Sequence, residues 1–223
     1  MQKIDITDED LKVARALCET QLLNPLTAES MFTAGIYSIL SVAERYDKHT
    51  LVYNDMMNNG LNAPEEIINR PGDVKDIVRV ARFPKQKIDR ITRFARWWER
   101  DGGSFSRDVL DDVANGRNRE FELRNRLAES APGIAYKAAS LFMSQCGYQN
   151  VVSIDVWMIR ALYGMGYDVA VPDYMTTSGP LKKEYLRLEK ILMGIAREEY
   201  GLSPVIFQSA LWAKLSSWNR KIL

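Results

Sequence analysis

The stretch Ala131-Pro-Gly-Ile-Ala-Tyr-Lys-Ala-Ala-Ser-Leu141 joins two segments that have helical periodicity. We expect helices over residues 118–129 and 136–146, with a tight turn at 131–135 between them. Pro132 and Gly133 are typical of such a turn, and a glycine allows close backbone approach. The N-terminus of the second helix offers backbone N–H groups and a positive dipole end, which suit a phosphate. An ordinary connection between two helices would have the same signature.

Helical periodicity dominates the rest of the chain, and the alternation typical of β-strands is scarce. The expected helices, besides those two, cover residues 8–23, 29–46, 50–59, 62–68, 73–82, 85–100, 106–115, 155–163, 178–200 and 204–218. Ser178 is expected to cap one of them, and Asp101-Gly-Gly103 to end another. The sequence therefore predicts an all-α protein. We expect one unit of two lobes, with residues 30–160 in the first and residues 1–29 and 161–223 in the second.

The composition limits the classes of function. With 46% hydrophobic residues the chain can bury a substantial core, and 30 Lys plus Arg nearly balance 29 Asp plus Glu. It has no apolar stretch of about 18 residues and no signal-peptide pattern, so we expect an intracellular protein with no membrane partner. Two cysteines and one histidine are too few for a four-cysteine cluster and too scattered for a zinc site. We expect no redox cofactor and no catalytic metal.

Positive charge is concentrated between Lys75 and Arg100. This segment holds nine basic and three acidic residues, a net charge of +6 in a chain whose own net charge is +1. Lys85 and Lys87 are among them. Such a cluster favours the phosphates of nucleic acid, with an affinity that falls as salt rises. A solvated helix face is an equally good interpretation of the segment taken alone.

Lys137 and Asp155 suggest a specific chemistry. Lys137 begins a helix of small and apolar residues, and Asp155 interrupts the apolar run Val151-Val-Ser-Ile-Asp-Val-Trp-Met-Ile159. A neutral amine can attack C1′ of a nucleotide and form a Schiff base, while a carboxylate stabilises charge on the sugar or takes the amine's proton. A free lysine has a pKa near ~10.4, so its surroundings must favour the neutral amine or supply a base. The simpler interpretations are a surface lysine and a helix N-cap.

The string Pro132-Gly-Ile-Ala-Tyr-Lys-Ala-Ala139, followed by Ile154-Asp-Val156, resembles the helix–hairpin–helix DNA glycosylase superfamily. That superfamily has a hairpin of the form Leu-Pro-Gly-Ile-Gly-x-Lys and an aspartate further along. The similarity extends to the basic helix that starts at Phe83 and to Phe207-Gln-Ser-Ala-Leu-Trp212. The lack of cysteines separates the chain from the iron–sulfur members. What remains looks like the compact prokaryotic and archaeal 8-oxoguanine DNA glycosylase/lyases.

The resemblance implies an enzyme that excises 8-oxoguanine from damaged double-stranded DNA and cleaves the strand. It makes Lys137 the Schiff-base nucleophile and Asp155 the activating carboxylate. The implied DNA contacts are Pro132, Gly133, Ile134, Ala135, Arg160, Lys85 and Lys87. A monovalent cation can accompany the hairpin, and we expect no other cofactor and a monomeric protein.

The same resemblance implies how a flipped base is recognised. Gln208 would read its edge and Trp212 would stack on its face, with Leu141 and Phe142 beside it. The segment Ile39-Leu-Ser-Val-Ala-Glu-Arg45 lies where the family places the residue that fills the gap left by the base. For Trp212, core packing is an equally good interpretation of the spacing.

Two residues depart from the superfamily pattern. The hairpin's second glycine is Ala135, and Trp157 stands where a histidine often follows the aspartate, so a phosphate contact is lost there or made by Arg160. The substrate is the expectation most exposed to these changes. The same fold acting on another damaged or mismatched base therefore stays open, as do a non-catalytic DNA-binding protein and an α-helical interaction protein.

Overall fold

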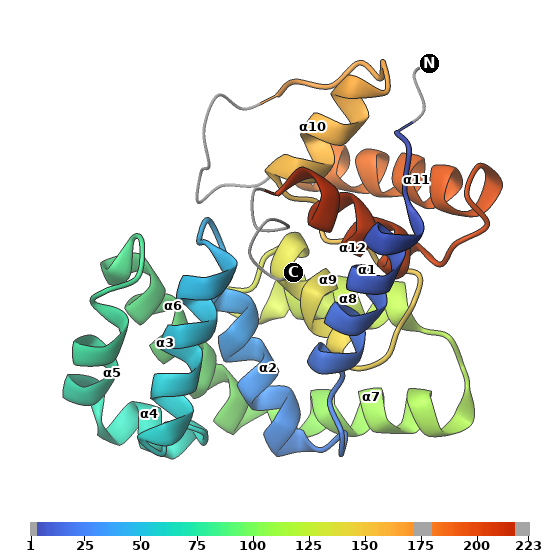
Figure 1. Cartoon of the computed structure of the whole chain (residues 1–223). Helices are drawn as coiled ribbons and strands as arrows, with labels where there is room; N and C mark the ends of the chain where they lie inside the picture. The colour runs from blue at the N-terminus through green and yellow to red at the C-terminus, as the bar shows by residue number, and fades with distance from the viewer. Residues whose placement is uncertain (1–3, 172–179, 217–223) are drawn as a thin grey trace. The chain divides into compact units, whose positions relative to one another are not determined.

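The computed structural model describes residues 4–171 and 180–216, and every regular element in those ranges is a helix (Figure 1). The chain divides into two compact units. We call Leu23–Cys146 the hairpin unit, and Met1–Leu22 together with Gly147–Leu223 the terminal unit. The boundary therefore follows Cys146 and not residue 160 as expected, and Asp155 belongs to the terminal unit.

The hairpin unit is arranged around helix α2, which packs against α3, α6, α7 and α9. Its elements in chain order are α2 (Ala28–Leu40), α3 (Tyr46–Asn58), α4 (Pro64–Asn69), α5 (Pro71–Val78), α6 (Pro84–Trp97), the π-helical turn η1 (Trp98–Gly102), α7 (Gly103–Asn115), α8 (Glu120–Ser130) and α9 (Tyr136–Gln145). Central placement explains why most residues of α2 are apolar and why all of Met31–Leu40 except Thr33 are buried.

Two of the boundaries that differ from expectation in this unit have a cause in the structure, and α3, α5 and α7 begin or end up to four residues from the expected positions. The helix expected over 29–46 ends at Leu40, and Ala43, with φ 52°, lies in the left-handed region before α3 begins. The helix expected to end at Asp101 continues through η1 directly into α7. Gly102 serves packing there, because a Cβ on it would lie 2.5 Å from the Trp98 ring. Glycine in this place permits close contact and does not terminate the helix.

An aromatic cluster forms the core of the hairpin unit. Gly35 of α2 makes room for the Phe94 ring of α6, since a Cβ at position 35 would lie 2.3 Å from it. The other members, with ring centroids 5.5–6.5 Å from their neighbours, are Phe32, Trp97, Trp98, Phe105 and Phe142. Burial of rings this large dominates the packing energy of a unit of this size.

The terminal unit is built on the last helix. Helix α12 (Pro204–Leu215) packs against α1 (Asp8–Gln21), α10 (Val156–Gly164) and α11 (Lys182–Glu198). Pro204 occupies its first turn, and the Ser203 side chain caps it. Helix α12 ends at Leu215 with Ser216 as its C-cap, three residues before the expected end. Helix α11 begins at Lys182 with Leu181 as its N-cap, so the start expected at residue 178 is wrong, and Ser178 itself lies outside the described residues. Among the described helices, none combines the length and apolar character needed to cross a membrane.

Candidate active site

Helices α8 and α9 form the helix–hairpin–helix that the sequence predicts. The two helices pack against each other, and the Ile134 N–H donates to the Ala131 carbonyl over 3.2 Å to close a four-residue turn. Gly133 occupies the third position of this turn with φ 87°. That left-handed conformation favours glycine, and proline is common at the position before it. The Pro-Gly pair therefore specifies the path of the chain from α8 into α9.

The two small residues of the hairpin have different structural roles. A Cβ on Gly133 would lie 2.7 Å from Cβ of Arg90 and 3.1 Å from its Cα, so the turn lies directly against α6. Ala135 is the N-cap of α9 with φ −94° and ψ 177°, an extended conformation that any residue adopts. The departure from glycine at 135 therefore leaves the turn unstrained.

Lys137 lies in the first turn of α9 and is half-buried. Its Nζ donates to Oγ of Ser41 over 2.8 Å. Ser41 is the C-cap residue of α2 and is 8% exposed, and its hydroxyl donates to the Ser38 carbonyl over 2.8 Å. The amine is thus held at the end of the central helix of its own unit.

His49, the chain's one histidine, lies buried near Lys137. Its Nδ1 hydrogen-bonds to the Arg45 carbonyl over 3.1 Å, so Nδ1 carries the proton. Its Nε2 is buried and makes no hydrogen bond within the described residues. Burial and the positive charge of Lys137 lower the pKa of His49 to about 3. The imidazole is therefore neutral at physiological pH.

Lys87 does not lie on the surface, and the expectation that it contacts DNA is wrong. Its Nζ donates to the Leu40 carbonyl over 2.8 Å and pairs with the Glu44 carboxylate at 3.2 Å. The two charged side chains are only 2% and 4% exposed. The reason is helical spacing, because Lys87 shares the inward face of α6 with Ile91 and Phe94.

The Glu44 carboxylate joins the α2–α3 turn to the start of α6. Besides Lys87 it accepts hydrogen bonds from the backbone N–H groups of Arg82 and Arg45. Burial opposes its ionisation, but these bonds and the Lys87 charge outweigh burial and lower the pKa of Glu44. This ion pair is structural.

Asp155, in the terminal unit, is the N-cap residue of α10. Its Oδ1 accepts from the N–H groups of Trp157 at 2.9 Å and Met158 at 3.1 Å. The interpretation as an N-cap is confirmed, and these two bonds engage a single carboxylate oxygen. The side chain is half-buried.

The extended segment before Asp155 is bound to two helices through its backbone N–H groups. Val152 donates to the Glu189 carboxylate over 3.3 Å, and Ile154 to the Tyr185 hydroxyl over 3.3 Å, both on α11. Ser153 donates to Oε1 of Gln208 on α12 over 2.9 Å. These bonds fix Asp155 within the terminal unit and explain why the unit boundary precedes it.

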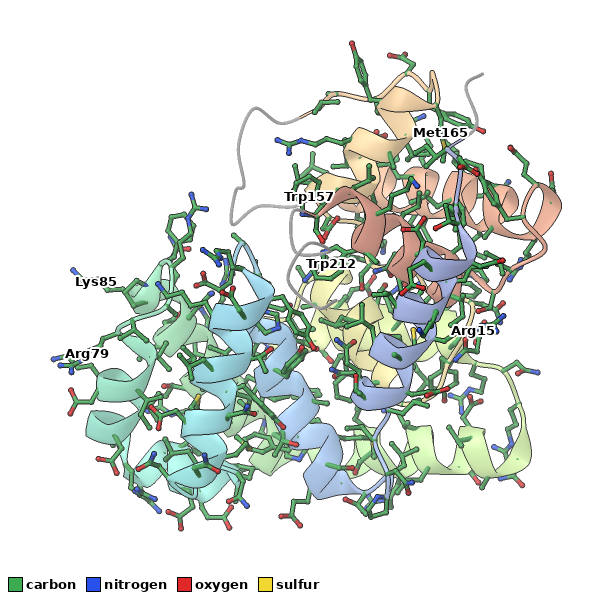
Figure 2. All side chains as sticks on the ribbon, in the orientation of Figure 1. Arg15, Arg79, Lys85, Trp157, Met165 and Trp212 are labelled. Carbon is green, nitrogen blue, oxygen red and sulfur yellow. The ribbon has the colours of Figure 1, made fainter. Side chains whose placement is uncertain are left out.

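Gln208 and Trp212 lie one helical turn apart on α12, and both are half-buried. Oε1 of Gln208 accepts from the Ser153 N–H and keeps one lone pair, and its NH₂ group is a hydrogen-bond donor that a ligand could use. Figure 2 labels Trp212 together with Trp157 of α10, which packs against α12. The Arg160 side chain is exposed, with its guanidinium 5.1 Å from the centre of the Trp157 ring.

The two α9 residues expected beside a bound base differ in exposure. Leu141 is half-buried. Phe142 is 0% exposed and packs against Phe105 with ring centroids 5.9 Å apart. The expectation that Phe142 contacts a base is therefore corrected, because its ring belongs to the core of the hairpin unit.

Most of the remaining basic segment is exposed. Arg79 and Lys85 point away from α5 and α6 in Figure 2. The other exposed members are Lys75, Arg82, Arg93, Arg96 and Arg100. Arg93 and Arg100 form surface ion pairs with Asp89 and Asp101. The segment thus presents positive charge to solvent along two helices.

Ser41, His49 and Glu44 surround the lysines, and none of them was singled out from the sequence for this role. Ser41 lies 96 residues from Lys137 along the chain. A serine at a helix end is too common to attract notice. Only the packing of α2 against α9 reveals its contact.

The chain is similar to known proteins in sequence. Residues 23–200 match the family model described as 8-oxoguanine DNA glycosylase. The 8-oxoguanine DNA glycosylase/AP lyase of Methanocaldococcus jannaschii is 33% identical over 93 residues, covering 41% of this chain and 40% of that protein. The enzyme of the same name from Thermotoga maritima is 34% identical over 92 residues, covering 41% and 42%. The chain thus matches about two fifths of the length of these relatives.

Solved structures show a similar fold. The crystal structure of the Methanocaldococcus jannaschii 8-oxoguanine glycosylase/lyase in complex with a 15mer DNA containing 8-oxoguanine has a TM-score of 0.68 and 22% identity, covering 99% of this chain and 94% of that chain. The 8-oxoguanine DNA glycosylase of Thermotoga maritima has a TM-score of 0.65 and 20% identity, covering 94% and 88%. At these identities the likeness shows the helix–hairpin–helix fold alone.

Proposed function

We propose that this chain, which belongs to the 8-oxoguanine DNA glycosylase family, excises 8-oxoguanine from double-stranded DNA and cleaves the strand at the abasic site. The observation that carries the proposal is the family match over residues 23–200, a range that includes the hairpin, Lys137 and Asp155. Two relatives bear the name of this activity, and one similar structure holds DNA with the lesion.

In the proposed reaction the neutral amine of Lys137 bonds to C1′ as the N-glycosidic bond breaks. The base leaves with the bonding electron pair and takes up a proton. The sugar ring then opens to a Schiff base, and loss of a C2′ proton expels the 3′ phosphate by β-elimination. The half-buried position of Lys137 at the start of a packed helix supports this role, because a nucleophile must be both accessible and held in place.

We propose that the Asp155 carboxylate stabilises the positive charge that develops on the sugar and accepts a proton from Lys137. Its support is preorganisation. Two N–H groups hold Oδ1, and three side chains anchor the backbone just before it. A carboxylate fixed in this way needs little reorganisation during the reaction.

The flipped base would be recognised by Gln208 and Trp212, with Leu141 as an apolar contact. Stacking on an indole ring tolerates any base, so the amide supplies discrimination. The NH₂ group of Gln208 is a donor and suits an acceptor on the base edge. This assignment is a proposal about the lesion, and the same residues would serve another damaged purine that carries an acceptor.

DNA would be held through its phosphates. We propose that the hairpin residues Pro132, Gly133, Ile134 and Ala135 bind one phosphate together with a monovalent cation on backbone carbonyl oxygens, and that Arg160 and Lys85 contact others. The turn suits such a site because it leads directly into the N-terminus of α9, where backbone N–H groups favour an anion. Gly133 at φ 87° and the extended Ala135 give the backbone this path. We propose that the protein acts as a monomer, which light scattering of the purified chain would test.

The proposal is tested by borohydride trapping on a duplex that contains a single 8-oxoguanine. Wild-type protein should give a covalent protein–DNA adduct and strand cleavage, and Lys137→Gln should give neither. A duplex with guanine in the same position should give no adduct. Absence of a wild-type adduct on the lesion duplex, in protein that binds the DNA, would refute the proposed activity.

The same assay on duplexes with other lesions or mismatches tests the alternative substrate. Faster adduct formation on another base would support the Schiff-base mechanism but show that 8-oxoguanine is not the preferred substrate. Trp157, where the family often has histidine, is the departure that makes this comparison necessary. A chain that binds DNA with the same affinity whether or not Lys137 is present, and forms no adduct with any duplex, would instead be a non-catalytic binding protein.

A further inference from the structure

We propose that Ser41 is a positioning residue for Lys137, and that its hydroxyl orients the amine for attack on C1′. This inference rests on the proposed function of Lys137 and assigns a further residue to the reaction. The carrying observation is a directed pair of hydrogen bonds, Lys137 Nζ to Ser41 Oγ and Ser41 Oγ to the Ser38 carbonyl, each 2.8 Å long.

The direction of these bonds decides what Ser41 offers the amine. A hydroxyl has one hydrogen and two lone pairs, and here the hydrogen is engaged by the Ser38 carbonyl. Ser41 therefore presents a lone pair to Lys137 and accepts one of its N–H groups. The neutral amine can keep the same bond, because it still has N–H groups to donate. Its lone pair, which must attack the sugar, is then not occupied by Ser41.

The anchor is also rigid. Ser41 is 8% exposed and lies at the end of α2, the helix against which most of the hairpin unit packs, including α9 itself. A long lysine side chain loses rotamer freedom when its tip is bound, and that cost is met before the substrate arrives. Ser41 thus fixes the position of Lys137 Nζ relative to the hairpin turn that precedes α9.

Uncharged side chains also lie near Lys137 and Ser41. His49 is buried and neutral at physiological pH, and Tyr37 packs edge-on against its ring with centroids 4.8 Å apart. A hydroxyl accepts from the ammonium or the amine without adding a charge at this place. The nearby carboxylate of Glu44 is bound instead to Lys87 and to backbone N–H groups.

The test is single-turnover trapping with saturating 8-oxoguanine duplex. Ser41→Ala should lower the rate constant for adduct formation by about tenfold to a hundredfold, because a misplaced reacting group loses that order of rate. Its dissociation constant for the same duplex should stay within about twofold, since the step affected follows binding. Ser41→Thr, which keeps the hydroxyl, should recover most of the lost rate.

Ser38→Ala is the matched control. It removes the same atom from the same residue type one turn earlier on α2, where the Ser38 hydroxyl is buried and makes no hydrogen bond to any residue that the structure describes. The carbonyl that accepts from Ser41 belongs to the backbone and is retained. Ser38→Ala should trap at the wild-type rate. In every variant the far-UV circular dichroism spectrum and the urea unfolding midpoint should stay close to those of wild type, which reports that the fold is intact.

Three outcomes overturn the inference while leaving the proposed function standing. The first is a wild-type rate in Ser41→Ala. The second is an equal loss in Ser41→Ala and Ser38→Ala, which would show a general packing effect. The third is a loss in Ser41→Thr as large as in Ser41→Ala, which would show that the hydroxyl is not responsible. Failure of wild-type protein to form any adduct refutes the proposed function, and with it this inference.

Discussion

Two lysines reach the same end of α2 from different helices, and their surroundings differ. Lys87 comes from α6, donates to the Leu40 carbonyl and pairs with the Glu44 carboxylate, with its side chain 2% exposed. Lys137 comes from α9, donates to the Ser41 hydroxyl and remains half-buried. The C-terminal end of a helix carries a partial negative charge, so it stabilises the positive charge of both lysines.

The difference shows how the same residue type can stabilise the fold at one position and be available for reaction at another. Burial lowers the pKa of Lys87, and the Glu44 carboxylate opposes that shift through its charge and hydrogen bond. A lysine enclosed in this way cannot reach a substrate. Lys137 donates to the Ser41 hydroxyl and keeps partial exposure, which is what a nucleophile requires.

The largest expected effect is on stability at Lys87. Lys87→Met leaves the Glu44 carboxylate buried without its cation and should lower the free energy of unfolding by about 3–5 kcal/mol. Lys137→Met, the matched substitution at the half-buried lysine, should change it by less than about 1 kcal/mol. Urea unfolding of the two variants measures both. Equal losses would remove the distinction between a structural and a chemical lysine.

A double variant shows whether the charge is the cause. Lys87→Met combined with Glu44→Gln removes both charges but keeps an acceptor for the backbone N–H groups of Arg82 and Arg45. It should recover most of the stability lost in Lys87→Met alone. A double variant as unstable as the single one would point to lost side-chain packing.

The next effect concerns the hairpin that carries Lys137. Gly133→Ala places a side chain at φ 87° and 2.7 Å from Cβ of Arg90, so we expect a loss of about 3 kcal/mol from backbone strain and overlap together. Ala135→Gly, two residues later at an extended and exposed position, should cost less than about 1 kcal/mol. Thermal and urea unfolding distinguish the two, and similar losses would contradict the described turn.

His49 supplies a pH-dependent effect of intermediate size. The folded-state pKa, about 3, lies below the ordinary value of 6.5, mainly through burial and then through the Lys137 charge. The unfolded chain therefore binds a proton that the folded chain does not, and stability falls as pH drops below 6.5. The loss from this group between pH 7 and pH 5 should be about 2 kcal/mol. His49→Gln should lack this part of the acid sensitivity.

The single histidine also reports on Lys137 directly. Because the Lys137 charge contributes to the lowered pKa, Lys137→Met should raise the pKa of His49 in an NMR titration of untagged protein. Lys75→Met, at an exposed lysine of α5 in the same unit, serves as the comparison variant. An unchanged pKa of His49 in Lys137→Met would mean that the amine lies further from the imidazole than described.

The smallest effect separates Lys87 from its exposed neighbour Lys85. Lys85→Gln should weaken DNA binding severalfold and lower the slope of log affinity against log salt by about 1, as expected for one lost phosphate contact. Lys87→Gln, in protein shown to be folded at the assay temperature, should leave that slope unchanged. Fluorescence anisotropy over a range of salt concentrations measures both slopes. A reduced slope in Lys87→Gln alone would reverse the assignment.

Local sequence patterns predicted the features that depend on few neighbours. Helical periodicity indicated the all-α class, and Pro132-Gly133 indicated the turn that leads into α9. Asp155 was recognised as an N-cap because capping involves residues only two or three positions apart. The family resemblance then attached expected roles to residues 137 and 155, and the match over residues 23–200 confirmed the family.

Errors arose where distant residues decided the outcome. Lys87 and Phe142 were expected at a DNA surface, but each lies on the buried side of its helix against partners far along the chain. Gly102 was expected to end a helix, and instead it accommodates the Trp98 ring within a π-turn. In each case the residue type allowed either outcome, and packing selected one.

By itself, then, the sequence determined which residue types and local turns are available: a lysine in the first turn of a helix, a glycine where the backbone turns left-handed, an aspartate at a helix start. Tertiary structure alone decided which lysine is enclosed and which is accessible, and it brought Ser41 to an amine 96 residues away. The physical reason is that burial and hydrogen-bond partners are properties of packed helices, and a helix pattern cannot specify what the opposite helix presents.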